Sequence, residues 1–303
     1  MNEYIIETQD LNFSYSKLTH DIENLNLQVP RGSIYGFLGP NGSGKTTTIR
    51  LLLGLLKKKS GTVTLFGNSL KNNRLTSLSK IAALIENPSL YNHLSGFDNL
   101  KIAARYRKVN QSRIEEVLEI VNLTYAKFKK VKKYSLGMKQ RLGLAISLLS
   151  EPEILILDEP TNGLDPKGII EMRSLIKSLN KEFGTTIFIS SHLLSEIEKT
   201  CSHVGIIREG KMLFQNTVDA LRESQNENMI IEVETSNSEL LNRIISSFFD
   251  NTKIIDDSFI NVTLNSKEEI PVLIDTIRKE EIAIYQVTIK NNLEELFLSL
   301  TEQ

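Results

Sequence analysis

The sequence has little that would support an extracellular or membrane-spanning protein. Its 303 residues include one cysteine, Cys201, which excludes an intrachain disulfide and is typical of a reducing compartment. No stretch reaches the roughly 18 uncharged apolar residues that cross a bilayer. The first residues are acidic and lack an apolar core, so no signal peptide is expected. We therefore expect a cytoplasmic chain, and any membrane task would need a separate membrane subunit.

The chain also lacks a strong net charge and is poor in aromatic residues. Lysine and arginine number 36 against 37 aspartate and glutamate, and aromatics make up 7%. Nucleic-acid binding is not expected, because it relies on positive fields and aromatic stacking. The charge is uneven, however: residues 1–220 hold 29 basic and 21 acidic residues, and residues 221–303 hold 7 and 16. This shift predicts a large domain over 1–221 and a small one over 222–303.

Alternating strand and helix patterns predict an α/β fold for the first domain. Three stretches, Ile34–Leu38, Ile154–Leu157 and Thr185–Ile189, are predicted to be buried strands, and Ile154–Leu157 is continuously apolar, as is typical of a parallel sheet. Residues 167–182 have the apolar spacing of an amphipathic helix. Strands that alternate with helices indicate crossover connections.

A smaller α+β domain is expected beyond the polar stretch 224–228. Its predicted order is strand, helix, two strands, helix, strand and a last helix over 293–300, which is compatible with a ferredoxin-like arrangement. It contains no catalytic constellation.

A glycine-rich stretch between a predicted strand and a predicted helix carries the clearest chemical signal. Its spacing is that of a phosphate-binding loop, formed by Gly39, Pro40, Asn41, Gly42, Ser43, Gly44, Lys45, Thr46 and Thr47. Glycines let backbone N–H groups surround an anion, and the helix presents its positive end. Lys45 would reach the terminal phosphates, and the Thr46 hydroxyl would bind Mg²⁺. The stretch predicts a nucleoside triphosphate site.

Two further positions are suited to phosphate chemistry. Asp158 and Glu159 follow a buried strand, where side chains point into the ligand crevice of an α/β sheet. We expect Asp158 to hold Mg²⁺ through water and Glu159 to act as the general base for the attacking water. Ser135 is a natural N-cap and Gly137 leaves backbone exposed, so a second helix N-terminus can bind an anion.

These motifs together resemble the ATP-binding cassette (ABC) ATPases, the energy-converting subunits of ABC transporters. Their order matches over residues 1–220: phosphate loop 39–47, signature 134–140, acidic strand end 154–159, D-loop 162–165, and a switch histidine at His192. The resemblance implies ATP with Mg²⁺ as the ligand. It also implies a P-loop NTPase fold of ABC type, with a mixed sheet, N-terminal antiparallel strands and a helical subdomain over about 87–150.

The resemblance assigns roles to five residues. Ser135 and Gly137 would contact the γ-phosphate held by a second copy of the chain, so that the enzyme is a head-to-tail dimer. His192 would orient the attacking water, and Asp165 would link the two sites across the dimer. Tyr15 would stack on adenine, although a single aromatic in a strand is often a core residue.

Two departures from the family pattern bear on mechanism. The common signature Leu-Ser-Gly-Gly-Gln is replaced by Tyr134-Ser135-Leu136-Gly137-Met138, which keeps the serine and the second glycine. Glu86 stands where the family usually has glutamine. A carboxylate can bind Mg²⁺ but donates no hydrogen bond when ionised, so we hypothesise that Glu86 is a metal-proximal coupling residue.

These departures and the appended second domain resemble the bacitracin-resistance and lantibiotic-immunity exporters. The predicted function is therefore an ATPase, peripheral on the inner face of the membrane, that powers efflux of an antimicrobial peptide through a separate permease. The alternatives are another cargo, such as a drug or lipid, or a soluble ABC regulator. Two lysine clusters, 57–59 and 127–133, are interpreted as a helix C-terminus and a solvated linker.

Overall fold

The computed structural model describes residues 3–16, 21–86, 88–223, 229–249, 251–280 and 282–289. The chain divides into two compact units, residues 1–217 and residues 218–303. The helix expected over 293–300 and the polar stretch 224–228 lie outside the described residues. The division falls close to residue 220, where the charge changes sign. The assignment of functional domains to these units stays a prediction.

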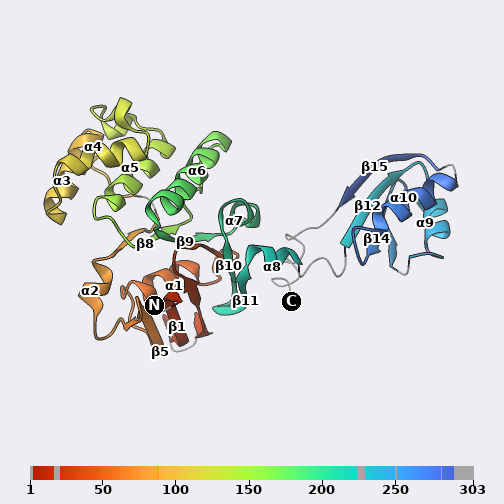
Figure 1. Ribbon diagram of the computed structural model, residues 1–303, viewed down its shortest axis with the longest axis horizontal. Coiled ribbons are helices and arrows are strands. Elements are labelled where there is room, and N and C mark those ends of the chain that lie inside the picture. The colour runs from red at the N-terminus through yellow and green to blue at the C-terminus, as the bar shows by residue number, and fades with distance from the viewer. Residues whose placement is uncertain are drawn as a thin grey trace. The chain divides into compact units, whose positions relative to one another are not determined.

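A six-stranded sheet forms the centre of unit 1 (Figure 1). Its strand order is β11-β10-β4-β9-β8-β7, and all neighbours are parallel except β10 and β11. The strands are β4 (Ile34–Leu38), β7 (Ile81–Leu84), β8 (Ile154–Asp158), β9 (Thr186–Ser191), β10 (His203–Arg208) and β11 (Lys211–Thr217). This mixed sheet confirms the predicted α/β fold.

The three stretches predicted as strands are buried on both faces of this sheet. Every residue of β4, β8 and β9 is buried. In β8, Leu155 and Leu157 belong to one apolar core, whereas Ile154 and Ile156 belong to another. Because successive side chains of a strand point to opposite faces, the sheet has a core on each side. The centres of these strands are therefore apolar, and Asp158, Ser190 and Ser191 lie at their carboxyl ends.

An antiparallel sheet from the N-terminal part covers one of these cores. Its strands are β1 (Tyr4–Phe13), β2 (Ile22–Leu25), β3 (Gln28–Pro30), β5 (Ser60–Leu65) and β6 (Asn68–Ser69). β1 pairs in the antiparallel sense with β2, β3 and β5. Ile6 and Val63 share their core with Ile49 of α1 (Lys45–Leu52). The expected N-terminal antiparallel strands are therefore present.

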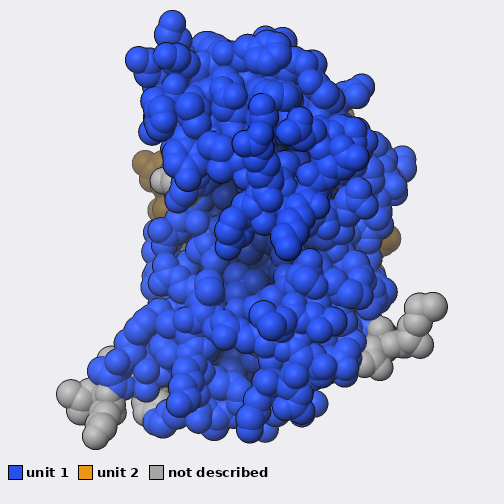
Figure 2. Space-filling model, turned by 90° about the vertical axis from the view of Figure 1, so that its left-hand side faces the viewer, with its two compact units in different colours: residues 1–217 blue, residues 218–303 orange. Residues whose placement is uncertain are grey.

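Helices cover the other core. They are α3 (Gly96–Arg107), α4 (Ser112–Ile120), α5 (Leu136–Leu148) and α6 (Pro166–Phe183), with 3-10 turns at Thr124–Ala126 and Val131–Lys133. Leu100, Leu118 and Leu142 share this core with Leu155 and Leu157. α3, α4 and α5 stand apart from the antiparallel sheet (Figure 1). The surface of unit 1 is hollowed near the middle of the face that Figure 2 shows.

Two short helices complete unit 1, α2 (Arg74–Leu78) and α7 (Leu194–Thr200). Directly after α7, Cys201 packs with its sulfur against Gly36 of β4. Burial raises the pKa of the Cys201 thiol well above its ordinary value, as expected for a packing residue. No helix among the described residues is long and apolar enough to cross a membrane.

Unit 2 has a split β-α-β order. Its elements are α8 (Val218–Glu223), β12 (Met229–Thr235), α9 (Ser238–Ile245), β13 (Thr252–Ile254), β14 (Phe259–Leu264), α10 (Glu269–Lys279) and β15 (Ile284–Ile289). The sheet order is β13-β14-β12-β15, and every neighbouring pair is antiparallel. Leu241 of α9 and Leu273 of α10 join a core with alternate strand residues. This order and pairing are those of a ferredoxin-like α+β fold.

We expect Leu155→Ala to lower the free energy of unfolding by about 2–5 kcal/mol, because it leaves a cavity in the middle of the central sheet. The matched control is Leu75→Ala, since Leu75 is 86% exposed on α2 and should change stability by less than about 0.5 kcal/mol. Denaturant unfolding of the full chain measures both. Equal effects of the two variants would contradict the central position of β8.

Candidate active site

The phosphate loop joins β4 to α1 at the carboxyl edge of the central sheet. Gly42 and Gly44 have φ of +84° and +105°, which side chains with a Cβ disfavour. A Cβ on Gly39 would collide with the carbonyl oxygen of Ile207 and with Ser43 Oγ. Gly44 is also the N-cap of α1, so the loop leads directly into the positive end of that helix. The backbone therefore has the form that an anion requires.

Lys45 is held inside the loop. Its side chain is 6% exposed, and its Nζ donates to the carbonyl oxygens of Gly39 (2.7 Å) and Pro40 (3.2 Å). The same Nζ lies 3.3 Å from Glu159 Oε1. The ammonium group is therefore fixed between the loop and the acidic end of β8, where it can attract an anionic ligand.

Glu159 contacts two of the predicted site residues. Its Oε2 lies 2.8 Å from His192 Nδ1, and its Oε1 faces Lys45. Oε1 is buried and accepts no hydrogen bond. A buried carboxylate oxygen that accepts no hydrogen bond needs a further hydrogen-bond donor, such as a water molecule. Glu159 is therefore placed to accept a proton from a water, with His192 as its neighbour.

Thr46 and Asp158 meet between the loop and β8. Thr46 Oγ1 donates to Asp158 Oδ2 at 2.8 Å, and Ser190 Oγ donates to Asp158 Oδ1 at 2.5 Å. Ser190 Oγ also accepts from the backbone N–H of Glu159 at 3.0 Å. The parallel register of β8 and β9 pairs Asp158 with Ser190 and so brings these groups together. Ser190 thus positions both acidic residues.

The residues present are suited to a nucleotide with Mg²⁺. Hydroxyl and carboxylate oxygens, here from Thr46 and Asp158, are the ligands that Mg²⁺ prefers. Among the described residues no group of three or more His, Cys, Asp or Glu is arranged to hold a metal alone. Ser43 Oγ is buried without a partner, and a bound phosphate would satisfy it.

Tyr15 lies beside the phosphate loop. Its hydroxyl is 3.4 Å from Thr47 Oγ1, and the residue is 57% exposed. Its backbone N–H donates to Asp21 Oδ2 at 2.8 Å, and Asp21 also lines the cavity of the loop. The ring is therefore a surface group next to the loop, not part of a core. Its stacking on adenine stays a prediction.

Ser135, Gly137 and Asp165 are not joined to this group. Ser135 caps α5, accepting from the N–H of Met138 at 3.2 Å, which confirms the predicted N-cap. Asp165 caps α6 by accepting from the N–H of Gly168 at 3.0 Å. Within the described part of the chain, no hydrogen bond or ion pair links the three residues to Lys45 or Glu159. Their contact with a nucleotide held by a second copy stays a prediction.

Glu86 has an arginine as its neighbour. Its carboxylate pairs with Arg50 of α1 at 2.8 Å, and its side chain is largely exposed. Glu86 has a φ of +60°, in the left-handed region. No ion pair or hydrogen bond of the described residues connects it to Thr46 or Asp158. Its proximity to the metal therefore also stays a prediction.

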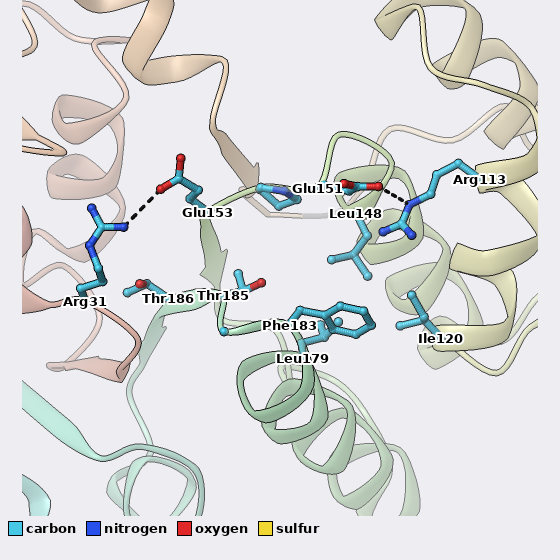
Figure 3. Close-up of a pocket in the computed structure, with 12 residues that line it drawn as sticks. Arg31, Arg113, Ile120, Leu148, Glu151, Glu153, Leu179, Phe183, Thr185 and Thr186 are labelled. Atoms are coloured by element: carbon cyan, nitrogen blue, oxygen red, sulfur yellow. Dashed lines mark hydrogen bonds and ion pairs between the residues drawn. The ribbon is translucent and has the colours of Figure 1, made fainter.

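Cavity volume alone would select a different part of unit 1 than the phosphate loop as the candidate site. The cavity at the phosphate loop has a volume of about 210 Å³. A cavity of about 500 Å³ opens at the amino ends of β8 and β9 (Figure 3). Phe183 and Leu179 form its apolar side, and Arg113 lies 3.6 Å from Glu151 at its edge. None of the predicted site residues lines it, so the chemistry identifies the smaller cavity.

Comparisons with known proteins agree with this geometry. The family model described as "ABC transporter" matches residues 22–162. The bacitracin transport ATP-binding protein BcrA of Bacillus licheniformis is 50% identical over 234 residues, which cover 77% of this chain and 76% of BcrA. The chain belongs to the ATP-binding subunits of ABC transporters.

Two further proteins are similar to this chain over most of its length. The lantibiotic transport ATP-binding protein SrtF of Streptococcus pyogenes is 45% identical over 215 residues, 71% of this chain and 92% of SrtF. Among solved structures, cbiO1 from Clostridium perfringens, part of the ABC transporter complex cbiONQ, has a TM-score of 0.69 at 26% identity. The match covers 82% of this chain and 96% of cbiO1. The predicted family and fold are confirmed.

The sequence prediction assigned no role to Ser190 or Asp21. Ser190 is fully buried, and its contacts with Asp158 and Glu159 depend on the strand register. Its only sequence signal is its place two residues before His192. Asp21 precedes β2 and meets Tyr15 only in the folded chain. Neither contact follows from spacing along the sequence.

We expect Ser190→Ala to raise the Mg²⁺ concentration needed for half-maximal ATP turnover by about 10- to 100-fold, because Asp158 loses a positioning hydrogen bond. Ser191→Ala is the matched control, since among the described residues the Ser191 hydroxyl bonds only to the backbone of Leu193. Metal titration of steady-state turnover measures both. An unchanged Mg²⁺ requirement in Ser190→Ala would contradict the positioning role.

Proposed function

We propose that this chain is the ATP-hydrolysing subunit of an exporter and works as a head-to-tail dimer on a membrane permease. The observation that carries the proposal is the contact of Glu159 with both Lys45 and His192, next to the Thr46–Asp158 pair. These groups come from three segments that the ABC motif order predicted. The family membership supports the same conclusion.

Each residue has a distinct task in the proposed reaction. The loop backbone, Ser43 and Lys45 bind the phosphates, and Thr46 and Asp158 hold Mg²⁺. The bound Mg²⁺ neutralises charge that develops on the phosphate oxygens. Glu159 takes a proton from the attacking water at Oε1, which accepts no hydrogen bond and faces Lys45, while His192 keeps the carboxylate oriented through Oε2. Positioning and electrostatics therefore supply most of the rate.

The second half of the site is proposed to come from another copy of the chain. Ser135 and Gly137 begin α5, and this helix end is polar and accessible because Ser135 is exposed. In the proposed dimer they meet the phosphates held by Lys45 of the other copy, and Asp165 lies between the two sites. ATP binding closes this dimer and hydrolysis opens it, which drives the permease from the cytoplasmic face of the membrane.

The proposed cargo is an antimicrobial peptide of bacitracin or lantibiotic type. The support is the similarity to relatives named as bacitracin and lantibiotic transport proteins. Another exported compound, such as a drug or lipid, is the alternative. In this proposal unit 1 binds the nucleotide and the permease. The permease selects the cargo.

Glu159→Gln tests the hydrolytic step. The variant should bind ATP and lower turnover by about 100- to 10,000-fold, because an amide cannot accept the proton. The matched control is Glu182→Gln, which removes an exposed carboxylate at the end of α6. Phosphate release by the purified chain measures turnover. Turnover at the unmutated rate would rule out Glu159 as the base.

Formation of the proposed dimer is tested by a measurement separate from that of hydrolysis. Glu159→Gln should accumulate as an ATP-bound dimer, and adding Ser135→Ala should return it to a monomer that still binds ATP. Size-exclusion chromatography with light scattering, with and without MgATP, measures the mass. A dimer that persists in the double variant would contradict the contact in trans.

The cargo is tested in the source cell. Loss of the chain should make the cell several-fold more sensitive to a peptide antibiotic, while sensitivity to small drugs stays the same. The unmutated chain should restore resistance, and Glu159→Gln should not, because export needs hydrolysis. Growth inhibition across bacitracin, a lantibiotic and an unrelated drug measures this. Sensitivity to the drug alone would favour the alternative cargo.

A further inference from the structure

The segment between α4 and α5 carries an unusual concentration of exposed cations and rings. We call it the basic–aromatic surface, formed by Tyr125, Phe128, Lys129, Lys130, Lys132 and Lys133. All six residues are exposed. The proposed reaction uses none of them, and the sequence alone suggested a solvated linker.

The structure shows a fixed segment in this place. Val131 and Tyr134 are buried, and the Tyr134 hydroxyl donates to the carbonyl oxygen of Ala126 at 2.8 Å. The N–H of Val131 donates to the carbonyl oxygen of Leu94 at 2.9 Å, which ties the segment to the chain that precedes α3. The exposed lysines therefore alternate with buried anchors. Presenting them to a ligand costs little further conformational entropy.

The four lysines of this surface have no acidic partner in the part of the chain that the structure describes. By contrast, Lys127 in the same segment is paired with Glu115 at 2.8 Å. No ion pair among the described residues involves Lys129, Lys130, Lys132 or Lys133. Four unneutralised cations within five residues produce a strong local positive potential. The surface thus complements an anionic partner.

The two rings favour one kind of anionic partner. Tyr125 is 77% exposed and Phe128 is 72% exposed, although both are large. Phe128 touches the folded chain through Phe97, at 5.7 Å between ring centroids. Lysines interleaved with exposed rings are typical of surfaces that bind at the headgroup level of a bilayer. A nucleic-acid strand would instead need a positive groove with successive stacking rings.

We propose that the basic–aromatic surface docks unit 1 on the anionic headgroups of a lipid bilayer. The lysines supply long-range attraction, and Phe128 and Tyr125 enter the headgroup layer. This goes beyond the proposed function, because it gives the ATPase an affinity for the membrane that does not depend on the permease. The attraction acts over about 10 Å at 0.1 M salt, so docking is reversible and sensitive to ionic strength.

Binding of the purified full chain to vesicles tests the proposal. Vesicles of phosphatidylcholine with about one third phosphatidylglycerol should bind the chain, and vesicles of phosphatidylcholine alone should not. Replacing all four lysines, Lys129, Lys130, Lys132 and Lys133, with glutamine should lower binding by up to about 600-fold, since each lysine contributes about fivefold. Phe128→Ala should weaken binding while keeping its salt dependence. Co-sedimentation across salt concentrations measures these effects.

A matched variant distinguishes the effect of this surface from the effect of the total positive charge of the chain. Lys57, Lys59, Lys71 and Lys181 are exposed lysines elsewhere in unit 1, and their joint change to glutamine removes the same charge. That variant should bind vesicles like the unmutated chain. Thermal unfolding and ATP binding of all variants check that folding is intact, because none of these lysines belongs to the nucleotide site.

Three results would overturn the proposal. The first is equal binding to neutral and anionic vesicles. The second is an equal loss of binding in the two lysine variants. The third is vesicle binding that survives in the four-lysine variant while its association with a detergent-solubilised permease, or with a single-stranded oligonucleotide, is lost. That last result would assign the surface to a protein or nucleic-acid partner.

Discussion

The parallel pairing of β4, β9 and β8 is the constraint on which the candidate active site depends. It aligns Leu38 with Ser191 and Asp158 with Ser190, so that three strands end at one edge of the sheet. The phosphate loop follows β4, Glu159 follows β8 and His192 follows β9. Groups from distant parts of the sequence therefore come within hydrogen-bond distance. A shift of one residue in this register would turn Asp158 to the other face.

The charged side chains of the site are paired with other groups of the protein. A buried ammonium or carboxylate is costly unless it is paired. Lys45 meets this requirement through two loop carbonyls and Glu159, and Asp158 through the hydroxyls of Thr46 and Ser190. In the proposed reaction, phosphates and Mg²⁺ take over some of these contacts. The protein thus holds its catalytic groups in place before the nucleotide arrives, which reduces reorganisation during hydrolysis.

Two surfaces of unit 1 lie close together along the chain. The basic–aromatic surface ends at Lys133, and Ser135 begins the helix proposed to meet the second copy. Tyr134, between them, is buried and fixed by its hydrogen bond to Ala126. The same rigid connection therefore positions both surfaces. Unit 2 has its own core and sheet.

The sequence by itself determined the family and the α/β order and predicted most residues of the candidate active site, because glycine spacing and buried apolar strands are local properties. It also predicted the Ser135 cap, which depends on neighbouring residues only. Tertiary structure alone decided which atoms meet: Ser190 with both acids, Asp21 with Tyr15, and Glu86 with Arg50. It likewise showed that residues 124–133 are a fixed surface. The contacts of Ser190 and of Glu86 join segments far apart in the chain, and only strand register and packing bring them together.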